Sequence, residues 1–196
     1  MSQKPFDIQD MESYLESMTL DYPICEYAFG DTSQIPLSDK VYTICETDCQ
    51  RYKKCWACPP NAGTIEYNIG RMKHYRRFFV YSTVWEVSDA MNFDACLGVR
   101  REHEAMARAF RRELFDHYGL TMQSLDEDPY PVIHFMSAGC AICDKCACPD
   151  EPCRHPEERL MSMESHGILI MQLVEELGVT YSYDGTTVVY FSMILY

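Results

Sequence analysis

The sequence is short of basic residues. Lys and Arg together number 17 in a chain of 196 residues, against 30 Asp and Glu, so the formal net charge is −13. Proteins bind nucleic acids largely by neutralising phosphates with Lys and Arg side chains. This balance therefore predicts a protein that does not bind DNA or RNA. The acidity is most simply a contribution to solubility, and it also suits docking to a basic patch on a partner.

Long apolar runs are missing as well. No stretch approaches the roughly 20 apolar residues that cross a bilayer as a helix. Residues 1–20 carry acidic side chains throughout and lack the apolar core of a secretory signal. We therefore expect a cytoplasmic protein without a membrane span. Hydrophobic residues still make up 47% of the chain, enough for a single domain over residues 1–196 with an ordinary core.

The common catalytic and nucleotide-binding motifs are also absent. The sequence contains no G-x-G-x-x-G, no P-loop, no G-x-S-x-G and no H-E-x-x-H. The C-x3-C-x2-C spacing expected of radical S-adenosylmethionine enzymes does not occur either. Whether the protein is an enzyme is therefore left open by its motifs.

Cysteine, in contrast, is abundant, with 11 residues. In a protein that is not exported, so many cysteines indicate metal binding rather than disulfides. The odd count agrees, because a framework of paired cysteines would leave one over. Most of these cysteines fall in two loops, at residues 45–60 and 139–156.

The second cysteine loop has the more specific spacing. Cys140, Cys143 and Cys146 form a C-x2-C-x2-C triplet, the spacing with which a loop wraps a cubane iron–sulfur cluster. Cys153 follows beside prolines and can supply the fourth thiolate. Cys148 lies too close to Cys146 to share the cluster and is expected to be a spare. Zinc is the alternative, although zinc sites are usually built from two separated C-x2-C pairs.

The first cysteine loop is less specific. It contains Cys45, Cys49, Cys55 and Cys58. Four thiolates within so short a segment could hold either an iron–sulfur cluster or zinc. Trp56 lies beside the expected ligands, where it either shields the metal from water or simply packs in the core.

Hydrophobic periodicity predicts the elements around these loops. Helices are expected at 7–18, from Thr64 into the basic cluster at 71–77, at 99–118 and at 163–177. Strands are expected at 24–29, 41–44, 78–87 and 130–136, and as a hairpin of 179–183 and 186–196 around Asp184-Gly185. The order of these elements predicts an α+β fold, with a mixed or antiparallel sheet, flanking helices and two cysteine-rich metal-binding loops.

Three further side chains carry expectations of their own. Cys25 lies in an apolar run and is expected to be a buried structural thiol. Glu104 and Arg108 stand at i, i+4 spacing on the long helix, where a solvated charged face is expected. The sequence does not predict a function for Cys25, Cys96 or Cys148.

Taken together, the cysteine motifs and the residues around them resemble those of a known family. The chain resembles a bacterial and archaeal family of predicted metal-binding proteins, a domain of unknown function. The resemblance covers about residues 40–180 and is carried by Cys45, Cys49, Tyr52 and Trp56-Ala-Cys58-Pro-Pro60, by Ala138-Gly-Cys140 with Cys143 and Cys146, by Pro152-Cys153-Arg154, and by Ser162-Met-Glu164 with Gly167-Ile168.

The resemblance implies a metal, most readily an iron–sulfur cluster, and no settled reaction. The family's first loop has three cysteines, matching Cys45, Cys49 and Cys58, with a small or polar residue in place of Cys55. Cys55 is therefore either the fourth ligand in this chain or incidental. If only three cysteines hold a cluster, one iron stays open to a substrate, another side chain or a partner.

Three hypotheses follow. The leading one is an electron carrier or redox accessory of anaerobic metabolism, which works with a redox partner protein. It binds two [4Fe–4S]-type clusters through Cys45, Cys49, Cys55, Cys58, Cys140, Cys143, Cys146 and Cys153. The second is an enzyme whose first-loop cluster has an open iron, and the third is a zinc-stabilised structural or interaction module. The sequence identifies neither substrate nor partner.

Overall fold

The computed structural model describes residues 7–181 and 184–196. Its helices are α1 (Ile8–Met18), α2 (Lys40–Asp48), α3 (Ile65–Met72), α4 (Phe93–His117) and α5 (Ile170–Glu176), with 3-10 turns η1 (Thr32–Gln34) and η2 (Glu164–His166). Its strands are β1 (Tyr27–Asp31), β2 (Arg77–Glu86), β3 (His134–Ser137), β4 (Met161–Ser162) and β5 (Thr187–Leu195).

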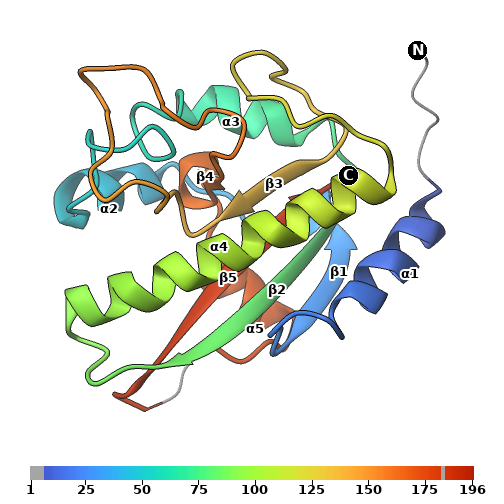
Figure 1. The fold of residues 1–196 in the computed structure, drawn as a ribbon, viewed down its shortest axis with the longest axis horizontal. Coiled ribbons are helices and arrows are strands. Elements are labelled where there is room, and N and C mark those ends of the chain that lie inside the picture. Colours follow the sequence, from blue (N-terminus) through green and yellow to red (C-terminus); the bar gives the residue numbers. More distant parts are fainter. Residues whose placement is uncertain (1–6, 182–183) are drawn as a thin grey trace.

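The strands form one sheet in the order β1-β2-β5-β3-β4. All neighbouring strands are antiparallel except β3 and β4, which are parallel, so the sheet is mixed. Figure 1 shows α4 crossing the sheet and both cysteine loops gathered beside β3 and β4. The predicted α+β class with a mixed sheet is confirmed.

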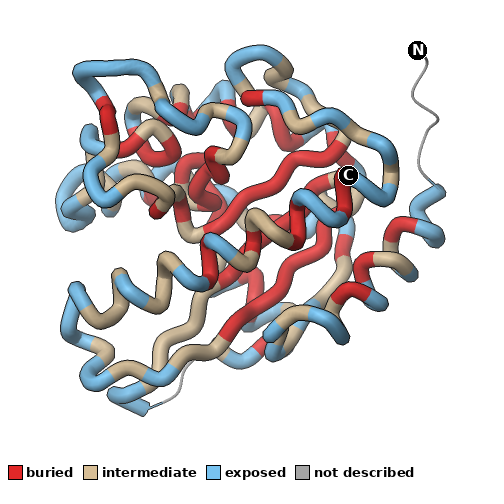
Figure 2. Tube along the Cα trace, in the orientation of Figure 1, coloured by how far each residue is buried: buried red, intermediate tan, exposed pale blue. Residues whose placement is uncertain are grey.

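The alternation of side chains along β2 explains why helices cover both faces. Phe79 and Tyr81 point to the face covered by α1 and α4, whereas Phe78 and Val80 point to the face covered by α5. All four side chains are buried, as expected for a central strand with a hydrophobic layer on each side. Figure 2 shows the same buried tract running along the middle strands.

The long helix begins earlier than its hydrophobic pattern predicts. The side chain of Asn92 accepts hydrogen bonds from the backbone N–H groups of Asp94 and Ala95, at 3.0 and 3.1 Å, and caps α4 at Phe93. The first turns of α4 are only partly buried, so they carry little of the apolar periodicity that marks the rest of the helix.

The predicted strand at 41–44 is wrong, because this segment is the first half of α2. β-branched residues favour strands only where a sheet surface receives them. Here Val41 is buried, whereas Ile44 is 57% exposed, which fits one turn of a surface helix. The hydroxyl of Tyr42 donates to the carbonyl of Gly63, so α2 is tied to the end of the first cysteine loop.

The C-terminal predictions also need correction. The helix expected at 163–177 is divided into η2 and α5 by Gly167, whose φ of 72° places it in the left-handed region. The strand expected at 130–136 is β3, which starts only at His134. β5 pairs with β2 and β3 rather than with 179–181, which form no strand, and residues 182–183 of the expected hairpin lie outside the described residues.

None of the described helices combines the length and the apolar character needed to cross a membrane.

Candidate metal-binding site

The sheet edge positions the second cysteine loop. β3 ends at Ser137 and β4 begins at Met161, and the two strands are parallel neighbours. The chain therefore leaves the edge, forms the second loop and returns beside its starting point. The first cysteine loop begins on α2, which carries Cys45, and it packs against the same edge, where the Ser162 N–H donates to the Ala57 carbonyl at 3.0 Å.

Two further contacts join the loops. The indole N–H of Trp56 donates to the carbonyl of Glu151 at 3.0 Å. The thiol of Cys148 donates to the carbonyl of Lys53 at 3.7 Å. Trp56 is thus half-buried between the loops rather than inside the hydrophobic core. Although the loops are far apart in the sequence, they form one structural unit.

The four predicted cysteines of the second loop line one cavity, together with one cysteine of the first loop. We call it the five-cysteine cavity; its thiols belong to Cys55, Cys140, Cys143, Cys146 and Cys153. Ala57, Ile142 and Ala147 supply apolar walls. The free space is about 20 Å³, which is room for about one water molecule, so the cavity is narrow.

The remaining first-loop cysteines line a different, wider cleft. We call it the three-cysteine cleft; it has a volume of about 320 Å³ and contains Cys45, Cys49 and Cys58. Arg51, Arg100 and Glu164 also line it. The structure therefore divides the four first-loop cysteines, because Cys55 faces the second loop whereas the other three face this cleft.

Cys55 and Cys58 form the boundary between the two cavities. The hydrogen bond from the Cys58 thiol, and then the Arg51 guanidinium, lower the pKa of Cys55. The same hydrogen bond, followed by burial, raises the pKa of Cys58 well above its usual range. The pair therefore shares one proton in its resting form, with the negative charge on Cys55.

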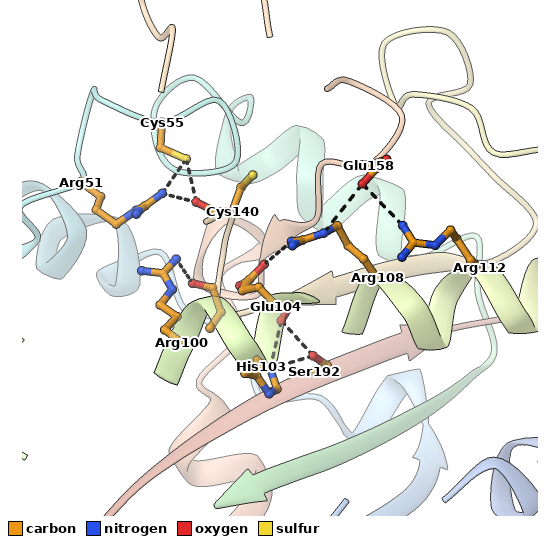
Figure 3. A network of polar contacts seen from close by, with 12 residues as sticks. Arg51, Cys55, Arg100, His103, Glu104, Arg108, Arg112, Cys140, Glu158 and Ser192 are labelled. Atoms are coloured by element: carbon orange, nitrogen blue, oxygen red, sulfur yellow. Dashed lines mark hydrogen bonds and ion pairs between the residues drawn. The ribbon is translucent and has the colours of Figure 1, made fainter. Parts of the chain in front are cut away.

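Two arginines hold the second loop against the first. The Arg51 Nη2 donates to the Cys55 Sγ at 3.2 Å and to the Cys140 carbonyl, and the Arg100 Nη2 donates to the Ala138 carbonyl at 2.5 Å (Figure 3). Both guanidinium groups thus approach the start of the second loop. They place positive charge beside the thiols, which favours thiolates.

Gly139 allows this close approach. Its φ of 106° is one that side-chain-bearing residues rarely adopt. A Cβ at this position would lie 2.7 Å from the Arg100 Nη2 and 3.5 Å from the Cys58 Sγ. The glycine therefore lets the second loop reach both the arginine and the first loop.

The expectation of a solvated charged face on the long helix is wrong for Glu104. This side chain is 0% exposed, and its carboxylate has no hydrogen-bond partner among the described residues. The nearest cation in an ion pair is the Arg108 Nη1, at 3.9 Å (Figure 3). Burial raises the pKa of Glu104 to about 8. The i, i+4 spacing could not reveal that the two loops cover this turn.

His103 lies beside Glu104 on α4 and is also buried. Its Nδ1 is 2.7 Å from the Thr83 hydroxyl, and its Nε2 is 3.1 Å from the Ser137 hydroxyl and 3.0 Å from that of Ser192. Burial lowers the pKa of His103 to about 4, so the ring is neutral. The network fixes α4 to the end of β3, where the second loop begins.

Burial also raises the pKa of one thiol in each of the two cavities. Burial raises the pKa of Cys140 to about 12. Burial, followed by Glu164 and Cys49, raises the pKa of Cys45 to about 11. Metal binding to these thiols would release protons, because thiolates are the ligands.

The predicted ligand set itself stays a prediction. Within residues 7–181 and 184–196, no group of three or more Cys, His, Asp or Glu side chains stands in a geometry that could hold a metal ion. The cysteines line shared cavities, but their sulfur atoms do not converge on one point.

The three cysteines left out of the predicted ligand set lie apart from both cavities. Cys25 is exposed, so the expectation of a buried thiol is wrong; its N–H extends the β1 pairing by donating to the Ser82 carbonyl at 2.9 Å. Cys96 lies near the start of α4, and its thiol donates to the Ala90 carbonyl at 3.4 Å. Cys148 is buried and contacts the first loop, not the cavity.

Arg51 and Arg100 were not predicted, although an arginine inside a cysteine loop is a usable signal for Arg51. Arg100 gives no such signal, because α4 is rich in arginine along its whole length.

Comparison with known proteins gives one match. Residues 30–196 match the family described as "Predicted metal-binding protein (DUF2284)". No curated protein and no solved structure matches the chain.

Proposed function

Because the chain belongs to this family of predicted metal-binding proteins, we propose that it holds two [4Fe–4S]-type clusters and serves in electron transfer. One cluster is held by Cys140, Cys143, Cys146 and Cys153. The other is held by the thiols of the three-cysteine cleft, so that one of its irons lacks a cysteine ligand.

The first centre is supported by the chemistry of the five-cysteine cavity. Its thiols supply the soft sulfur ligands that iron–sulfur clusters and zinc both require. The C-x2-C-x2-C spacing of its loop favours the cluster. Arg159 and Arg154 line the cavity. Arg159 is paired with Asp126 at 3.1 Å, whereas Arg154 forms no ion pair among the described residues, so Arg154 can offset thiolate charge. Cys55 is a fifth thiol beside this centre rather than a required ligand.

A cluster is larger than the space now between the thiols, so binding requires the loop to open outward. Residues 139–156 contain no helix or strand, so the movement would break only side-chain contacts, such as those of Trp56 with Glu151 and of Arg101 with Asp144. Asp144 and Lys145 are exposed, and they lie at the outer turn between the cysteines. The movement can therefore be confined to the loop, while β3 and β4 keep its ends fixed.

The division of the first-loop cysteines carries the proposal. Cys45, Cys49 and Cys58 share a cleft that Cys55 does not line. These are the same three positions that the resemblance implied for the cysteines of the first loop. The cleft is open to small molecules, unlike the five-cysteine cavity. This observation favours the enzyme hypothesis as a second candidate, because an iron with an open position can bind a substrate.

The electron-transfer role is supported by the contact between the two sites. Cys58 lines one cavity and Cys55 the other, and a hydrogen bond joins their thiols. Electrons could thus pass from one centre to the other through adjacent side chains. We propose that a redox partner protein exchanges electrons with the first centre, whose loop is exposed at its tip.

Anaerobic purification with metal and sulfide analysis tests this function. We expect a brown protein with about eight irons per chain and visible absorption that dithionite bleaches. A colourless protein with stoichiometric zinc would refute both iron hypotheses and support the zinc-stabilised module. About four irons per chain would indicate only one of the two centres. The iron content of Cys58→Ser and Cys143→Ser would then show which one, because only the variant that lacks a ligand of that centre should lose its iron.

A further inference from the structure

A third cavity adjoins the three-cysteine cleft. We call it the apolar cleft; its volume is about 400 Å³, within the range of small-molecule sites. Its apolar lining comes from three elements: Phe93 and Leu97 of α4, Ile170 and Met171 of α5, and Val189 and Phe191 of β5.

The topology of the sheet creates this cleft. β3 pairs only with Met193–Leu195 at the end of β5, because the chain then turns away into the second cysteine loop. Among the described residues, no strand therefore pairs with the same edge of β5 over Thr187–Ser192. α4 and α5 cover opposite faces of the sheet, so a space remains between them along this free edge (Figure 1).

The two clefts meet at a pair of opposite charges. Arg100 and Glu164 line both the apolar cleft and the three-cysteine cleft. The Arg100 side chain is fixed by its hydrogen bond to the Ala138 carbonyl, while its Nε is buried without a partner. No ion pair within 4.0 Å joins Arg100 to Glu164 in the described part of the chain.

From this arrangement we propose that the apolar cleft binds a small zwitterion of the α-amino acid class with an apolar side chain. The carboxylate of the ligand lies at Arg100, its ammonium group at Glu164 and its side chain in the cleft. Each charged residue thereby contacts a group of the opposite charge, and each favours a different end of the ligand.

The apolar body of the ligand has a suitable receptor. Phe93 and Met171 are each 48% exposed, from α4 and α5 respectively, so a ligand between them removes apolar surface from water. The Tyr190 hydroxyl donates to the Cys96 carbonyl at 2.8 Å, which fixes another wall of the cleft.

The inference deepens the proposed function, because the charged end of the ligand would lie beside the three-cysteine centre. Binding itself requires only protein side chains. It can therefore be measured on the full chain both with and without metal, and a failure of iron loading does not decide it.

The test uses three probes that share a phenyl ring. L-Phenylalanine carries both charges, 3-phenylpropionate lacks the ammonium group and 2-phenylethylamine lacks the carboxylate. We expect L-phenylalanine to bind at least about tenfold more tightly than either analogue, since hydrogen bonds to charged groups contribute roughly 1.5–3 kcal/mol. Equal affinities for the three probes, or no binding of L-phenylalanine at millimolar concentration, would overturn the proposal.

Variants assign each end of the ligand. Arg100→Gln should remove the preference for L-phenylalanine over 2-phenylethylamine, and Glu164→Gln should remove the preference over 3-phenylpropionate. Val189→Trp should fill the cleft and abolish binding of all three probes. Arg112→Gln, an exposed substitution on the same helix, should leave all affinities unchanged.

Metal analysis of the same variants separates this role from metal ligation. Glu164→Gln should keep the iron content of the unsubstituted protein. Loss of iron in this variant would place the carboxylate on the metal and refute its role as the ammonium partner. Circular dichroism confirms that each variant is folded, and Val189→Ala, which enlarges the cleft, should retain the preference for the zwitterion if Val189→Trp fails to fold.

Discussion

Gly139→Ala tests how the second cysteine loop is held against α4. The substitution adds one methyl group at a φ of 106°. The new Cβ would lie 2.7 Å from the Arg100 Nη2, which would have to move. Because that nitrogen donates to the Ala138 carbonyl at 2.5 Å, the hydrogen bond would be broken or distorted.

Two contributions to the loss of stability can be estimated separately. A side chain at positive φ costs about 1–2 kcal/mol. Loss of a hydrogen bond from a charged donor to a buried acceptor costs roughly 1.5–3 kcal/mol more. Gly119→Ala is the matched control, because Gly119 also has a positive φ, of 62°, but a methyl group added there would have no other atom within 4 Å.

We expect Gly139→Ala to lower the free energy of unfolding by about 2 kcal/mol more than Gly119→Ala does. For a chain of this size, that difference corresponds to about 4–8 °C in melting temperature. Urea unfolding of the metal-free chain measures it directly. Equal destabilisation by the two substitutions would show that Arg100 does not anchor the loop and that Gly139 is not needed for its close approach.

The remaining predictions concern the ligands, the buried histidine and the loop. Cys55→Ser should keep about eight irons per chain, whereas Cys58→Ser should lose about four, as metal analysis will show; iron loss from both would return Cys55 to the ligand set. The pKa of His103 is lowered to about 4 by burial, so the unfolded chain binds its proton first as the pH falls. Stability should therefore decrease between about pH 6.5 and 4, by up to about 1.4 kcal/mol per pH unit for this group. In the metal-free protein His103→Gln should reduce this dependence without abolishing it, because burial also lowers the pKa of His134 and His166; His155→Gln, at an exposed position, is the control. Removal of metal by a chelator should speed hydrogen exchange within 139–156 but not in β2, and uniform exchange changes would contradict a local rearrangement.

The sequence predicted those elements whose local pattern agrees with their tertiary environment. Phe78 to Val87 is rich in β-branched and aromatic residues, and it forms the interior strand β2 at nearly the predicted bounds. The segment at 41–44 has similar composition but becomes helical, because only Val41 meets the core. A short apolar run does not reveal whether one face or both will be covered.

One part of the candidate site could likewise be predicted from local sequence, and another part could not. The grouping of Cys140, Cys143, Cys146 and Cys153 follows from spacing within one loop, so it could be predicted. The side on which Cys55 lies depends on how the first loop packs against a segment more than 80 residues away in the sequence. No spacing within the first loop encodes that contact.

Arg51 and Arg100 place positive charge beside the five-cysteine cavity and the three-cysteine cleft. The chain has a net charge of −13, yet Arg51 and Arg100 are turned inward, toward the loops, and neither forms an ion pair with a carboxylate among the described residues. Both guanidinium groups are partly buried, so an anion beside each of them would be stabilised. On the Arg51 side this anion is the Cys55 thiolate, together with the thiolates that form when a metal displaces the protons of neighbouring cysteines. On the Arg100 side, a thiolate of the three-cysteine cleft and a ligand carboxylate would compete for the same charge. If the proposed cluster is present, ligand binding in the apolar cleft should therefore weaken the electrostatic stabilisation of the adjacent thiolates and shift the reduction potential of that cluster.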